Sequence, residues 1–207
     1  MNSRAESGIH AVTAGVADCY SRLHRRLVSP QALVDPSWGC ELAQQGSCLR
    51  WGAQLCRKPG STLVQQVYFS SFLQRFALLT PPELQKILCA CVLLSRREKF
   101  RHCIDGVKIR ALQALIGSAS MAALMASKTT HRAPVGSSDW CVESLLSEGF
   151  AHVERASAGQ PRMLLDLIRL GLPRQLAVVS SVHDAGDFEA LVREVHQWYP
   201  EFTWLFG

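Results

Sequence analysis

The spacing of apolar residues along this chain predicts amphipathic helices. At about 100° per residue, Ile87, Leu88 and Cys91 fall within about 60° of Leu84, which makes one apolar stripe on a helix. A stripe of this width is typical of a helix that packs one side against a core. We therefore expect the segment that begins near Leu84 to be a core helix.

The start of this helix is marked by three residues. Thr80 is a good N-cap, Pro81 is favoured at the first helical position, and Glu83 can close a capping box onto the backbone of Thr80. The helix is predicted to begin at Pro81. It then continues or restarts through a block of positive side chains, and we expect it to end near Asp105-Gly106.

The same criteria predict helices along most of the chain. They are expected at residues 12–27, 36–43, 48–57, 61–76, 107–125 (interrupted at Gly117-Ser118), 140–153 (capped by Asp139), 162–170 and 187–199. Residues 67–69 are also rich in strand formers, and the pattern over 175–182 fits either a short strand or a helical turn. The predicted fold class is all-α.

The expected architecture is an irregular multi-helix bundle in a single compact domain over residues 11–207. Residues 1–10 are polar, and we expect them to be disordered. Residues 127–138 are the longest polar stretch rich in Gly and Pro, so any division into two helical subdomains is predicted to fall there.

Composition supports a globular protein. The chain has 207 residues, of which 48% are hydrophobic and 19% charged, enough for one substantial core. Its longest apolar run, residues 87–94, is far shorter than the roughly 18 to 20 residues of a membrane span, and residues 1–20 do not resemble a signal peptide. These features predict a cytosolic location.

The eight cysteines are expected to be reduced thiols. No pair of them has C-x-x-C spacing, and a chain of this length does not need disulfides for stability. Cys89 and Cys91 lie about 200° apart on a straight helix and cannot bind one ion together. No metal and no cofactor are predicted, although a metal or redox role for some thiols stays open as an alternative.

The net charge of the chain favours acidic partners. The formal net charge is +5 and the isoelectric point is about 8.9, a modestly basic balance. Basic residues cluster at 22–26 and 96–101, where three interpretations are open: a solvated helix face, a contact with an acidic protein, or a contact with nucleic acid.

The aromatic C-terminus either docks onto the core of the chain or anchors a partner. The predicted partner-binding residues are Arg96, Arg97, Lys99, Arg101, Trp204 and Phe206.

Motifs of common enzymes do not occur in the sequence. It has no phosphate-binding G-x-x-x-x-G-K-[ST], no G-x-G-x-x-G, no H-E-x-x-H and no G-x-S-x-G. We therefore do not expect an enzyme. A catalytic Cys–His couple assembled through the fold, for example with His102 or Cys103, is kept as an alternative.

Four segments of the chain resemble a known family. They are ELQKILCACVLLSRREKFRHCIDG, IRALQALIG, SEGFAHVERASAGQPRMLLDLIRLGLP and WYPEFTWLFG, which begin at residues 83, 109, 147 and 198. Together they resemble the SctK (YscK, PscK, OrgA) family, small cytosolic accessory proteins of the sorting platform in bacterial type III secretion. The similarity is firmest at residues 101–103, before Pro173 and at 205–207. Before Pro36 the chain has Leu33-Val34-Asp35, where the family often has an aromatic-x-His.

This resemblance implies a mainly helical adaptor with no enzymatic activity and no cofactor. Such proteins bridge the cytosolic forkhead-associated-like domain of the inner-membrane ring protein and the pod protein, at the cytosolic face of the inner membrane. The family has no motif for these contacts, so the contact residues above come from the sequence alone. The alternative function is a helical nucleic-acid-binding regulator, for which the two basic clusters would have to share one face.

Overall fold

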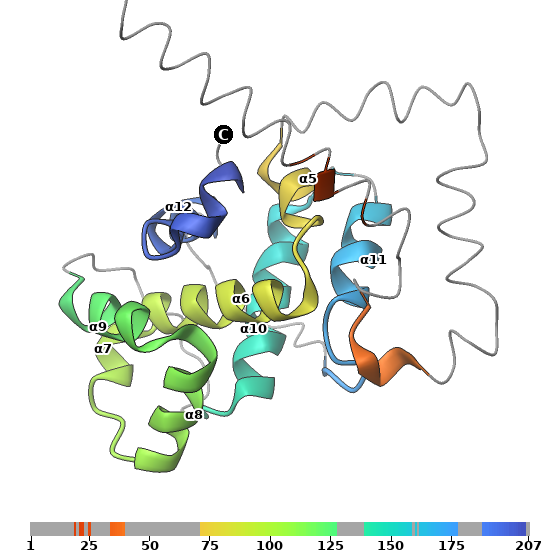
Figure 1. Ribbon diagram of the computed structural model, residues 1–207. Coiled ribbons are helices and arrows are strands. Elements are labelled where there is room, and N and C mark those ends of the chain that lie inside the picture. Colours follow the sequence, from red (N-terminus) through yellow and green to blue (C-terminus); the bar gives the residue numbers. More distant parts are fainter. Residues whose placement is uncertain are drawn as a thin grey trace, which may run out of the picture.

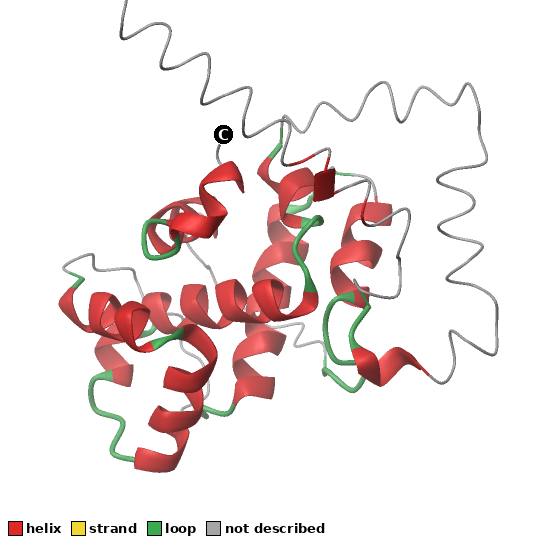
Figure 2. Cartoon of the chain, in the orientation of Figure 1, coloured by secondary structure: helices red, strands yellow, loops and turns green. Residues whose placement is uncertain are grey.

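The computed structural model describes residues 19, 21, 22, 25, 34–39, 71–127, 139–158, 160, 162–177 and 188–205. Every regular element in this part of the chain is a helix, and no strand occurs in it (Figure 2). The predicted all-α fold class is confirmed. The predicted domain limits stay a prediction, because residues 1–10 and 128–138 lie outside the described part.

The described elements are short and medium-length helices. They are η2 (Pro36–Trp38), α5 (Phe72–Phe76), α6 (Pro81–Ser95), α7 (Arg97–Phe100), α8 (Gly106–Ile116), α9 (Ser118–Ala126), α10 (Val142–Ala156), α11 (Arg162–Leu170), α12 (Phe188–His196) and η3 (Pro200–Leu205). The bounds of α11 agree with the prediction, as does the break between α8 and α9.

Helix α6 begins where its capping signals predict. Pro81 is the first helical residue, and the Glu83 carboxylate accepts a hydrogen bond from the Thr80 backbone N–H at 2.8 Å. The stripe prediction was too narrow, because all residues from Ile87 to Ser95 are buried and not only those on one side. A helix that is apolar all round is surrounded by the rest of the fold.

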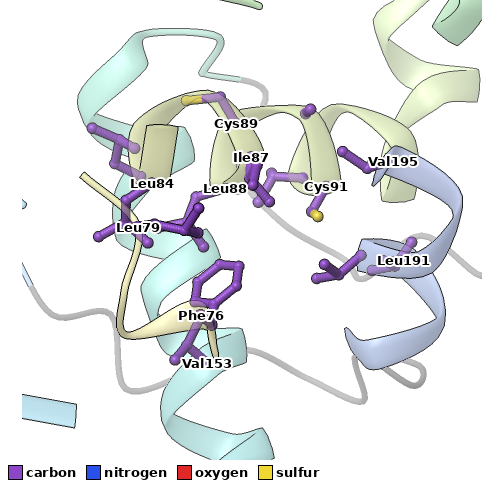
Figure 3. Close-up of a cluster of buried hydrophobic side chains, with 14 of the residues drawn as sticks. Phe76, Leu79, Leu84, Ile87, Leu88, Cys89, Cys91, Val153, Leu191 and Val195 are labelled. Atoms are coloured by element: carbon purple, nitrogen blue, oxygen red, sulfur yellow. The ribbon is translucent and has the colours of Figure 1, made fainter. Parts of the chain in front are cut away.

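Other helices surround α6. Figure 1 shows α6 across the middle of the molecule, with α10 crossing it, α12 above it and α8 below it in this view. All three contact α6 along its buried length. In Figure 3, Leu191 and Val195 of α12 face Cys91, while Phe76 and Leu79 lie near the other end of the helix.

The crossing of α6 and α10 depends on a glycine. A Cβ atom added to Gly149 would lie 2.9 Å from the Leu88 Cβ atom and 3.3 Å from the Leu88 carbonyl oxygen. Real Cβ atoms do not approach so closely, so only glycine fits at this position. The absence of a side chain lets the two backbones come together.

A sharp turn separates α8 from α9. Gly117 has φ +91°, a conformation that residues with a side chain rarely adopt, and the two helices are bent by 109° relative to each other. The Tyr199 hydroxyl donates to the Ile116 carbonyl at 3.0 Å, which satisfies an acceptor at the end of α8. Burial raises the pKa of Tyr199 to about 12, so the phenol stays protonated as a donor at neutral pH.

No helix in the described ranges is long and apolar enough to cross a membrane by itself. The pair α8 and α9 meets that test of length and composition only when the two are joined across their bend.

Some predicted boundaries differ from the structure. Cys141, and not Asp139, is the N-cap of α10, and the Asp139 carboxylate instead accepts from the Cys141 N–H at 3.2 Å. Asp105 is the N-cap of α8 rather than the end of the preceding helix. The last long helix, α12, ends at His196, because the chain then turns into η3. Predictions for 40–70 and 178–187 lie outside the described residues, and 175–177 form no regular element.

Candidate protein-binding surface

The basic segment at residues 96–101 divides between the interior and the surface. Arg96 is only 3% exposed, and its guanidinium forms an ion pair with the carboxylate of Glu148 on α10. Glu148 is also buried, and its other oxygen lies 3.9 Å from His152 Nε2. Arg96 therefore joins the end of α6 to α10.

Arg97 is also enclosed by the fold. It is 5% exposed, and its guanidinium donates to the carboxylate of Glu98. That hydrogen bond lowers the pKa of the Glu98 carboxyl. A solvated helix face is therefore wrong for Arg96 and Arg97, because both arginines serve contacts within this chain.

Lys99 and Arg101 lie at the surface. Lys99 is exposed, and the Arg101 side chain is 39% exposed. Arg101 donates to the Met125 carbonyl at 2.8 Å, which ties the chain after α7 to the end of α9. These two residues are the members of the predicted basic set that a partner can reach.

The aromatic C-terminus packs onto the core of the chain. Trp204 is 5% exposed, and Phe202 and Leu205 are also buried. The guanidinium of Arg22 lies 4.2 Å from the centre of the Trp204 ring and also pairs with Glu83 at 3.0 Å. Docking onto the core is thus confirmed for Trp204, whereas Phe206 lies outside the described residues.

These contacts also bear on nucleic-acid binding. That alternative requires the two basic clusters to present their charges on one face, yet Arg22, Arg96 and Arg97 are engaged within the chain. Arg25 is exposed, while His24 and Arg26 lie outside the described residues. The geometry therefore gives the alternative no support.

Exposed apolar side chains gather in one region. We call residues 97–126, which comprise α7, α8, α9 and their connections, the α7–α9 lobe; it forms the lower left of the molecule in Figure 1. Among the described residues, the large hydrophobic side chains that are exposed are Ile104 (97%), Val107 (69%) and Met125 (41%). All three belong to this lobe.

Sequence reasoning missed these apolar residues as a surface. Met125 keeps the helical rhythm of the apolar residues in α9, but its side chain is 41% exposed at the end of the helix. Ile104 lies between Cys103 and the Asp105 N-cap, at the boundary between two predicted helices, so no periodic pattern includes it. Its position before an N-cap would instead suggest packing against the helix as a hydrophobic staple, so no local signal indicated its exposure.

The thiols of α6 are core side chains. Cys89 and Cys91 are both fully buried, and Figure 3 shows them on opposite sides of the helix, as the predicted angle between them requires. Burial raises the pKa of both thiols above that of a free cysteine, so neither is a reactive thiolate at neutral pH. Cys89, Cys91, Cys103 and Cys141 are free thiols.

This burial predicts a clear order of chemical modification. In the native protein, Cys103 and Cys141, which are partly exposed, should react with iodoacetamide, whereas Cys89 and Cys91 should react only when the fold opens. Burial also raises the pKa of Cys141, so its modification should be slower at neutral pH than that of an ordinary thiol and should speed up as the pH rises. Mass spectrometry of peptides after timed alkylation measures these rates. Rapid native modification of Cys89 or Cys91 would contradict the buried placement.

One comparison with known proteins gives a match. The model of a protein family described as bacterial type III secretion protein (HrpB4) matches residues 10–201. Searches of curated proteins and of solved structures found no match. The matched range covers η2 and all the described α-helices, and it ends within η3, after Glu201.

Proposed function

We propose that this chain, which belongs to the HrpB4 family of bacterial type III secretion proteins, is a non-enzymatic adaptor of the secretion apparatus. The observation that carries this proposal is the family match over residues 10–201. It agrees with the expected membership of a type III secretion accessory family. In the proposed role, the protein works by contacts with other proteins of the apparatus.

The proposed partners are two. One is the cytosolic forkhead-associated-like domain of the inner-membrane ring protein, and the other is the pod protein of the sorting platform. The adaptor would act in the cytoplasm at the inner face of the membrane, held there by these protein contacts. These finer statements rest on the resemblance of the sequence to the SctK family.

The basic part of the contact is proposed to be Lys99 and Arg101. Both are exposed, and both lie on the α7–α9 lobe. Exposed charges of this kind speed up association with an acidic surface and orient the partner, while most of the affinity comes from a few buried anchors. Arg96, Arg97 and Trp204 are buried within the chain and would support the surface rather than touch a partner. Phe206 stays a predicted contact.

A charge-reversal experiment tests this proposal. In K99E/R101E, the rate of association with the ring protein's cytosolic domain or the pod protein should fall by about tenfold at low salt, because steering by rim charges is lost. Surface plasmon resonance with the purified proteins measures the rate. The control variant R162E/R193E reverses two exposed arginines outside the lobe and should bind like the wild type.

The possible results of this experiment test the adaptor function and the role of Lys99 and Arg101 separately. If the wild-type chain binds neither protein, the adaptor proposal is wrong. If the wild type binds and K99E/R101E associates just as fast, the adaptor proposal stands, but Lys99 and Arg101 are not part of the contact.

A further inference from the structure

Ile104 and Val107 form what we call the apolar tip of the α7–α9 lobe. Packing within the chain does not explain why their side chains are exposed. Ile104 is 97% exposed and Val107 is 69% exposed, although both are large aliphatic residues. Single exposed apolar residues are normal on a protein surface. Here, however, the exposed large hydrophobic side chains of the described residues all lie within one lobe, and two of them are three positions apart.

The position of Ile104 makes its exposure more informative. Asp105 is the N-cap of α8, so Ile104 occupies the preceding position and Ile109 is the fourth residue of the helix. In many helices, apolar residues at these two positions pack together as a hydrophobic staple. Ile109 instead packs against the core, and Ile104 is left almost fully in solvent. The residue that would ordinarily close the helix end is therefore available to another molecule.

The tip is held in place by hydrogen bonds. The Asp105 carboxylate accepts from the backbone N–H groups of Val107 at 3.0 Å and Lys108 at 3.2 Å. On the other side of Ile104, Arg101 donates a hydrogen bond to the Met125 carbonyl of α9 at 2.8 Å. A surface that is fixed before binding loses less conformational freedom when a partner docks.

Basic side chains flank the apolar tip. The lobe carries five Lys and Arg residues and two carboxylates, which gives it +3 of the chain's formal charge of +5. Both carboxylates are engaged internally: Glu98 accepts from Arg97, and Asp105 caps α8. The exposed basic residues are Lys99, Arg101 and Arg110, whereas the half-exposed Lys108 pairs with the Asp139 carboxylate at 3.4 Å.

From this geometry we infer that Ile104 and Val107 insert into an apolar pocket on a protein whose pocket rim carries carboxylates. The carboxylates would face the basic side chains around the tip, and the two aliphatic side chains would supply the buried anchor. The inference deepens the proposed adaptor function and rests on it, because it takes the occupant to be one of the two adaptor partners. A protein is chosen over a lipid surface because the match to a type III secretion family supports protein contacts.

The test measures the affinity of the full chain for each partner. Isothermal titration calorimetry is performed with the ring protein's cytosolic domain and with the pod protein, for the wild type and I104S/V107S. The double variant should bind one of the two proteins at least about tenfold more weakly, because a central apolar anchor is lost. Its thermal unfolding should be unchanged, because the removed side chains are exposed.

A second pair of variants separates the apolar contact from added charge. I104D/V107D should weaken the same interaction further, because its carboxylates face the acidic rim. Q197D/T203D adds the same charge at exposed positions outside the lobe and should bind like the wild type. Binding of the wild type should also weaken as salt is raised, because opposite charges are screened.

The remaining results would overturn the inference in distinguishable ways. If the wild type binds neither protein, the adaptor function fails and this inference fails with it. If the wild type binds and I104S/V107S binds equally well, only the tip is excluded as a contact. If light scattering shows that the chain alone forms a dimer and that I104S/V107S is a monomer, the occupant is a second copy of the chain. If the wild type sediments with phosphatidylglycerol vesicles and I104S/V107S does not, the occupant is a membrane.

Discussion

Glu148→Ala should unfold at a much lower urea concentration than the wild type, with a loss of about 3–5 kcal/mol in the free energy of unfolding. The substitution removes the carboxylate that pairs with Arg96 and leaves that guanidinium charge buried, since Arg96 is only 3% exposed. A buried charge without its counter-ion is among the most destabilising changes a fold can suffer. Urea titration followed by far-UV circular dichroism measures the loss.

A double variant provides the matched control. In R96M/E148L both charges are removed and replaced by apolar side chains, so no buried charge is left unpaired. We expect this variant to recover most of the stability, because well-packed apolar residues often replace a buried ion pair at little cost. If Glu148→Ala is as stable as the wild type, the buried pair does not hold α6 to α10. If the double variant is no more stable than the single one, the loss does not come from the unpaired charge of Arg96.

Gly149→Ala should also lower the stability, by a net amount of up to about 2 kcal/mol. Alanine favours a helix over glycine by about 1 kcal/mol, which by itself would stabilise α10. The added Cβ atom would however lie 2.9 Å from Leu88 Cβ and close to the Leu88 backbone oxygen, where little can move because both helices are buried. Overpacking of this kind costs about 1–3 kcal/mol and forces the helices apart, so we expect a net loss.

Gly39→Ala is the control for this substitution. Gly39 has φ −57° and no atom within 4 Å of an added Cβ, so alanine there should be neutral or slightly stabilising. Differential scanning calorimetry compares the two variants with the wild type. A Gly149→Ala protein that melts at or above the wild-type temperature would show that the α6–α10 crossing is looser than the structure has it.

These stability predictions affect how binding experiments are interpreted. Arg96 and Arg97 stand in the same basic segment as Lys99 and Arg101, and a charge reversal at Arg96 would place a second buried carboxylate against that of Glu148. Such a variant would lose partner binding because the fold is damaged. Loss of binding therefore counts as evidence of a contact only for the exposed residues of the segment.

Local chemistry in the sequence predicts much of the fold. The start of α6 follows from Thr80, Pro81 and Glu83, whose capping contacts involve residues three positions apart. The turn at Gly117 follows from the one residue type that readily adopts positive φ. These features could be predicted because each is determined by a few neighbouring residues.

The exposure of the candidate site could not be predicted in this way. The burial of Arg96 is decided by Glu148, which is distant in the sequence and arrives only when α10 crosses α6. Trp38 likewise donates to the Leu172 carbonyl at 2.8 Å, a contact between η2 and the chain after α11 that no local pattern indicates. Whether a basic or apolar residue faces a partner depends on such tertiary contacts, so the accessible tip at Ile104 emerged only from the structure.

The most direct test of the adaptor account is to mix the purified chain with the ring protein's cytosolic domain and the pod protein, and to measure the mass of the product by size-exclusion chromatography with light scattering. The account predicts a complex of all three proteins that does not form when the chain is left out. The ring domain and the pod protein binding each other equally well without this chain, or competing for it so that only two-protein complexes appear, would contradict a bridging role.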